Sequence, residues 1–149
     1  MQKTERFLIM LAFVAAALNL SDVPGAGFFT VLAMLLLALF YNFLSFALLN
    51  GLSLRGIFKK ASYQEITTRQ IVAAIFVGFG LAQTLIGILF SLQSYPAARF
   101  MLALGLFYLA LVAVVSSLIA YRAPSPLLRR IFNRLLLVGT AGFLAYFSG

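Results

Sequence analysis

Residues 28–49 read FFTVLAMLLLALFYNFLSFALL, and no side chain in this stretch is charged. A helix of about 20 apolar residues crosses the hydrocarbon core of a bilayer, which is about 30 Å thick. The stretch is long enough to cross once. Its polar side chains, such as Asn42 and Ser45, are uncharged and compatible with a helix that contacts other helices in lipid.

The composition of the whole chain also indicates a membrane protein. Of 149 residues, 64% are hydrophobic and only 9% are charged, whereas soluble domains carry about 25% charged residues. Lipid must therefore be the main solvent. We expect residues 1–149 to form a single transmembrane domain with no separate soluble domain.

Four further apolar runs lie before and after residues 28–49. They cover residues 7–20, 70–92, 100–121 and 135–148. The predicted fold class is all-α: a polytopic membrane protein of about five transmembrane helices. The run at 7–20 has the form of a signal peptide, but we interpret it as an uncleaved helix. The last run is short, so its helix is expected to begin near Leu127 or Ile131, with a tilted or half-inserted helix as the alternative.

Basic residues predict the orientation. If the N-terminus is cytoplasmic and the chain crosses five times, all 11 basic residues except Arg99 fall on the cytoplasmic side, as the positive-inside rule requires. We therefore expect a multi-pass protein of the inner (cytoplasmic) membrane with its C-terminus outside. The basic connection at 51–69 is expected to contain a short surface helix over 54–63.

The two turns on the outer side match when the chain is shifted by 72 residues, from Leu20 to Leu92. Pro24 and Pro96 occupy the same position in these turns. The match predicts two helical hairpins in the same orientation, over about 4–60 and 70–130, with an extra helix at about 131–148. Such repeats are related by an axis along the membrane normal.

One hairpin resembles a known family. Gly87-Ile-Leu-Phe90-Ser-Leu-Gln-Ser-Tyr-Pro96-Ala-Ala, followed by Met101-Leu-Ala-Leu-Gly105-Leu, is similar to a hairpin of small Bacteroidota inner-membrane proteins, among them the L component of the gliding and type IX secretion motor. The resemblance implies a hairpin architecture. It does not imply motor activity, because the family's membrane glutamate has no counterpart in 28–49 or 100–121 and residues 1–149 contain no counterpart of its long cytoplasmic tail.

The residue types exclude several kinds of chemistry. The chain has no cysteine and no histidine, so thiolate metal sites and the usual haem ligands are absent. Glu5 and Glu65 are placed on the cytoplasmic side, Asp22 at an outer turn, and Arg134 is expected to extend its guanidinium to the head groups. We therefore predict no catalytic residue, no cofactor and no metal, and we do not expect an enzyme or a nucleic-acid-binding protein.

Two groups of residues inside the runs are candidates for contacts. Asn19, Asn42, Gln83 and Thr84 are polar and are expected to form interhelical hydrogen bonds, with a polar path as the alternative. Small residues spaced along the third and fifth runs are expected to let helices approach closely, the fifth run against either a partner protein or its own bundle. These small residues are Ala74, Gly78, Gly139, Ala141, Gly142 and Ala145.

From these absences we expect a non-catalytic accessory or structural subunit of a larger inner-membrane complex. Its expected partners are other membrane proteins and membrane lipids, with no nucleic acid and no soluble substrate. The alternative is a small transporter or channel, or the membrane subunit of a multi-component carrier. In that case a homo-oligomer would enclose a pore lined by Asn42, Gln83 or Thr84.

Overall fold

The computed structural model describes residues 1–53, 55–64, 66–122 and 125–148. These residues form five long α-helices and no strand, which confirms the predicted all-α class. The helices are α1 (Gln2–Leu20), α2 (Ala26–Leu49), α3 (Thr68–Leu92), α4 (Ala98–Arg122) and α5 (Pro126–Ser148). Each of the five predicted apolar runs therefore lies within one helix.

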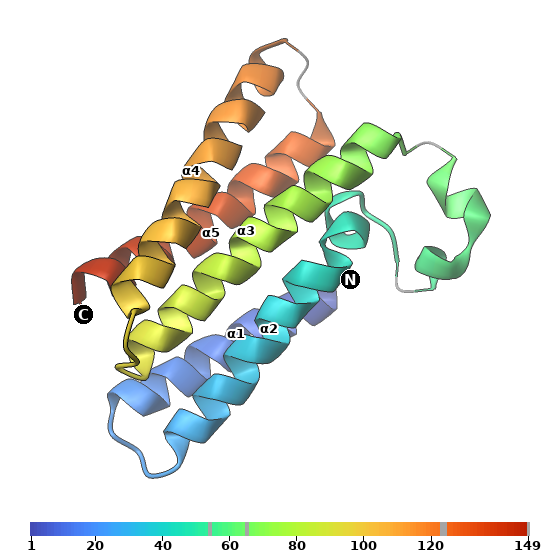
Figure 1. Ribbon diagram of the computed structural model, residues 1–149. Coiled ribbons are helices and arrows are strands. Elements are labelled where there is room, and N and C mark those ends of the chain that lie inside the picture. Colours follow the sequence, from blue (N-terminus) through green and yellow to red (C-terminus); the bar gives the residue numbers. More distant parts are fainter. Residues whose placement is uncertain (54, 65, 123–124, 149) are drawn as a thin grey trace.

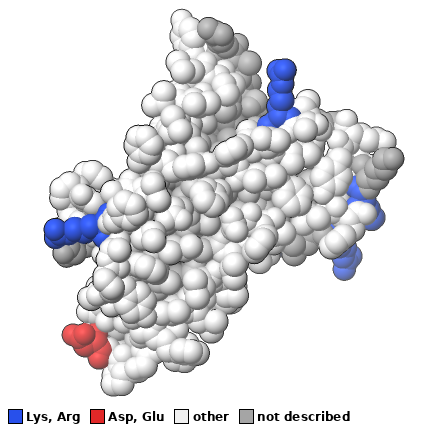
Figure 2. Space-filling view, in the orientation of Figure 1, with Lys and Arg blue, Asp and Glu red and all other residues white. Residues whose placement is uncertain are grey.

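Three helices are long and apolar enough to cross a membrane: α2, α3 and the Ala98–Tyr121 part of α4. These three indicate a membrane-embedded protein. α1 and α5 are also long, but α1 carries Glu5 and α5 carries Arg134, each together with further charges, so composition alone does not mark them as spans. Figure 2 shows a broad uncharged surface with the charged side chains at its margins.

α3 is the central helix. It packs against α2 on one side and against α4 and α5 on the other, while α1 packs mainly against α2 (Figure 1). Glycines on α3 permit these close approaches: a Cβ at Gly78 would meet the side chain of Ser45 on α2, and a Cβ at Gly87 would lie 2.9 Å from the backbone nitrogen of Leu102 on α4. The core therefore lies mostly along α2 and α3.

α4 is the least covered of these three apolar helices. Only 22% of its most apolar window is buried, against 56% for α3. In Figure 1, α4 leans away from α3 towards its own C-terminal end. Most of its apolar surface must therefore face lipid or another molecule.

The turns at Pro24 and Pro96 have the same backbone conformation. Asp22 and Ser94, which differ by 72 residues, have φ values of 54° and 53°, and Gly25 and Ala97 have φ values of 80° and 66°. Pairs of hydrogen bonds repeat with the same shift, for example from the amide of Val23 to the carbonyl of Leu18 and from that of Tyr95 to that of Phe90. Pro24 and Pro96 lie between the left-handed residues in each turn.

The connection from α2 to α3 differs from the prediction. In place of a surface helix over 54–63, the structure has two short 3₁₀ turns, Gly56–Phe58 and Lys60–Tyr63. The amide of Gly56 donates to the hydroxyl of Ser53, a local bond that competes with regular helix. The start of the predicted surface helix at Leu54 and the predicted cytoplasmic residue Glu65 lie outside the described residues.

Candidate functional site

A buried ion pair joins the first and last helices. Glu5, on the first turns of α1, is only 5% exposed. Its Oε1 accepts hydrogen bonds from the hydroxyl of Tyr41 on α2 at 2.8 Å and from Nε of Arg134 on α5 at 2.6 Å. Nη2 of Arg134 pairs with the other carboxylate oxygen. The carboxylate thus connects three helices through charge-assisted bonds.

This pair corrects the sequence prediction. The sequence predicts that Arg134 extends its guanidinium to the head groups, but in the structure Arg134 turns inward to the buried Glu5. The two residues are 129 positions apart, so no local pattern links them. One signal was available: Glu5 lies seven residues before Ala12, two helical turns away, and therefore shares the face of α1 that packs inward.

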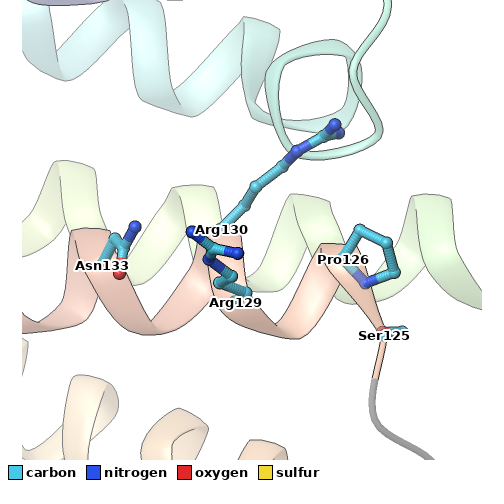
Figure 3. Close-up of a pocket in the computed structure, with 5 residues that line it drawn as sticks. All are labelled: Ser125, Pro126, Arg129, Arg130 and Asn133. Carbon is cyan, nitrogen blue, oxygen red and sulfur yellow. The ribbon is translucent and has the colours of Figure 1, made fainter.

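Arg130 links α5 to the end of α2. Its Nη1 donates to the carbonyl of Leu49 at 3.0 Å, and its guanidinium fills the space beside Gly51. Figure 3 shows Arg130 extending from α5 towards this neighbouring segment. A cation at the C-terminal end of α2 complements the negative end of the helix dipole. Gly51 has a φ of 78° and leaves no room for a Cβ beside the guanidinium, which explains the glycine.

Two recesses surround these arginines. One, of about 340 Å³, is lined by residues of α1, α2 and α5 that include Arg6, Glu5 and Arg134. The other, of about 570 Å³, is lined by Ser125, Pro126, Arg129, Arg130 and Asn133 and is drawn in Figure 3. They share Arg130 and Asn133. With four arginines and one carboxylate among the lining residues, the region is basic.

The site is charged, but its one carboxylate is already engaged in hydrogen bonds. The Glu5 carboxylate already accepts three hydrogen bonds, which leaves it little capacity to act on a bound molecule. Among the residues that the structure describes, no group of three His, Cys, Asp or Glu side chains is placed to hold a metal ion. The arrangement can attract an anion, and it can hold three helices together.

The predicted polar residues Asn42, Gln83 and Thr84 are divided between two places. Asn42 and Gln83 line the same small recess of about 110 Å³ between α2 and α3. The amide of Gln83 also donates to the sulfur of Met101 on α4 at 3.3 Å. Thr84 does not join them: it is fully buried, and its hydroxyl donates to the carbonyl of Gly80 in its own helix.

The predicted packing residues on α3 lie in the core. Ala74 is fully buried. Gly78 lies directly against α2, where a Cβ would come within 2.5 Å of the carbonyl oxygen of Tyr41.

The small residues of α5 divide into two sets. A Cβ at Gly142 would meet Thr84 and Leu106, and the carbonyl of Ala145 accepts a hydrogen bond from Ser91. These two residues pack inside the bundle. Gly139 has open space beside it, and Ala141 is exposed in a trough between α1 and α5.

Side-chain bonds also join the segments beside the turns at Pro24 and Pro96. The Asn19 amide donates to the carbonyl of Leu92 at 3.0 Å, and the Gln93 amide donates to the carbonyl of Gly27 at 3.2 Å. The bond of Asn19 to Leu92 agrees with the interhelical hydrogen bond expected of this residue, whereas the bond of Gln93 was not predicted. Gln93 lies next to the turn at Pro96, and that position was the available signal for its bond.

Comparison with known proteins gives no relative: no known protein family, no characterised protein and no solved structure matches this chain.

Proposed function

We propose that the chain is a non-catalytic accessory subunit of a larger protein complex in the inner membrane. The observation that supports this is how the interior polar groups are used. Most of them are used in hydrogen bonds to neighbouring helices or to their own backbone. The donors are Asn19, Thr30, Tyr41, Thr84, Ser91, Gln93, Arg130 and Arg134.

The proposed topology is five crossings with the N-terminus in the cytoplasm and the C-terminus outside. α1 has 19 residues and α5 has 23. At 1.5 Å per residue each reaches close to the bilayer's hydrocarbon thickness of about 30 Å. The Glu5–Arg134 pair neutralises two of their charges in place. The matching conformations of the two outer turns support two repeated hairpins related by an axis along the membrane normal.

The surface proposed for the partner is the trough between α1 and α5. Its volume is about 890 Å³, and its walls are almost wholly apolar, with Phe13 and Met10 on α1 and Leu144 on α5. Thr140 and Ala141 form a stretch of small residues in it. Small residues allow two helix backbones to approach closely in lipid, where dispersion contacts drive association. A partner's transmembrane helix is the occupant that this wall favours.

The test uses two alanines that are both exposed. Ala141 lies in the trough, and Ala110 lies on the exposed side of α4. We expect tagged protein, purified in a gentle detergent from its native host, to bring a stoichiometric membrane partner. The Ala141→Trp variant should lose that partner, and the Ala110→Trp variant should keep it. A photo-crosslinking amino acid in place of Ala141 should give one discrete adduct.

Purification only as a lone chain, or equal behaviour of the two tryptophan variants, would contradict the proposal. A lone chain that carries flux in proteoliposomes and loses it in Gln83→Leu would support the channel alternative.

A further inference from the structure

A second groove opens on the other side of the bundle, where α4 leans away from α3. It is bounded by α3, α4 and α5 and has a volume of about 670 Å³. This is within the range of about 300–1,000 Å³ typical of ligand sites. On α4 its lining extends from Tyr108 to Ile119, about 16 Å of helix at 1.5 Å per residue. The groove is therefore long and narrow.

Polarity changes along the groove. Its walls are apolar, with Phe76 on α3, Val112 and Val115 on α4, and Ile131 on α5. The polar lining residues include Arg69 and Gln70, in the first turn of α3. Such a surface suits a molecule with a hydrocarbon chain and a polar head.

The rim is basic. No acidic residue is among the described residues that line the groove. Ser125, at the start of α5, lines both this groove and the recess that contains Arg129. A head group at the rim would therefore meet Arg69 and lie near a second guanidinium. Both arginines are exposed to solvent or head groups, at the end of the bundle that the proposed topology places at the cytoplasmic surface.

We propose that this groove binds one acyl chain of an anionic membrane phospholipid, with the lipid phosphate held at Arg69. The charge at the rim identifies the head group as anionic, because a zwitterionic lipid would bring an ammonium group beside an arginine. Arginine is well suited to a phosphate because its guanidinium offers paired donors. The apolar walls take the chain. This proposal rests on the groove, so it can hold whether or not a partner occupies the trough between α1 and α5.

The absence of tryptophan from the chain makes the groove directly observable. Phe76 lines the groove, and Phe43 lies on α2 at a comparable distance from the same end of the bundle. Both rings are more than half exposed, so a tryptophan can replace either. Each variant, F76W or F43W, then carries one fluorophore, which brominated acyl chains quench on contact.

The experiment measures quenching in vesicles that contain a small fraction of brominated lipid, either phosphatidylglycerol or phosphatidylcholine. The preference for the anionic lipid is the ratio of quenching by brominated phosphatidylglycerol to quenching by brominated phosphatidylcholine. This ratio should be about fivefold larger for F76W than for F43W, which is the effect of one basic residue at the head-group level. Adding Arg69→Gln to F76W should reduce the preference to the F43W value. Adding Arg55→Gln, which removes a charge from the exposed α2–α3 connection, should leave it unchanged.

Equal preferences for F76W and F43W would overturn the proposal. Both of these variants keep Arg69 at the rim, so the comparison does not depend on any change to the basic residues. A preference that survives Arg69→Gln, or one that Arg55→Gln removes equally, would also overturn it. Such a result would mean that the anionic lipid responds to the overall charge of the surface and not to this rim.

Discussion

Replacing Glu5 by alanine is expected to lower the free energy of unfolding by about 3–5 kcal/mol, because it leaves a buried guanidinium without its counter-ion. The Arg134 side chain is only 12% exposed, and within the part of the chain that the structure describes Glu5 is its carboxylate partner. Tyr41 loses its acceptor as well. The three helices that meet at this carboxylate should then loosen together at their shared end.

Denaturant titration in detergent micelles, followed by circular dichroism, measures this effect. Lys3→Ala is the matched control, since Lys3 lies on the same turn of α1 and is exposed; its effect should stay within about 0.5 kcal/mol. The double variant Glu5→Leu/Arg134→Leu should recover most of the loss, because apolar residues can replace a buried pair without leaving a charge behind. An effect of Glu5→Ala no larger than that of Lys3→Ala would mean that the pair does not hold the helices.

Gly78→Ala is expected to destabilise the bundle by about 3 kcal/mol, at the upper end of what overpacking does. The new methyl group would overlap the side chain of Ser45 and come within 2.5 Å of the carbonyl oxygen of Tyr41. A backbone atom cannot rotate away, so α2 and α3 would have to separate. The same titration measures the change.

Gly139→Ala is its matched control. It is also a glycine inside a helix, but a Cβ there meets nothing within 4 Å, so the change should stabilise the helix by roughly 0.5–1 kcal/mol. The two variants should therefore shift the unfolding midpoint in opposite directions. Shifts of the same sign and size would contradict the packing of α2 on α3.

The sequence predicted the helices well because lipid imposes a simple rule. Every buried peptide group must bond within its own segment, so long apolar runs become helices. The turns at Pro24 and Pro96 were also predictable, since proline has no backbone N–H to donate a helical hydrogen bond. The predicted surface helix at 54–63 was wrong because that segment has no long apolar run, and local bonds such as that of Gly56 to Ser53 decide its shape.

The tertiary contacts were not predictable. Glu5 looked like a residue of the membrane surface, and only the arrival of α5 beside α1 makes it a buried partner of Arg134. The repeat of small residues predicted that Gly78 and Gly142 would meet helices, but not which ones. The groove at Phe76 depends on the angle at which α4 leaves α3, and no one-dimensional pattern records that angle.

The central claim is that all five helices cross the membrane and that the Glu5–Arg134 pair lies at the cytoplasmic end. The chain has no cysteine, so a single introduced cysteine reports on which side of the membrane its position lies. An impermeant maleimide is added to cells whose outer membrane has been removed and whose inner membrane is intact, so that it reacts only with cysteines on the outer side. Ser21→Cys, Ser94→Cys and Phe147→Cys should label directly, and Lys3→Cys and Ser125→Cys only after permeabilisation. Labelling of positions 125 and 147 from the same side would show that α5 does not cross, and would contradict the account.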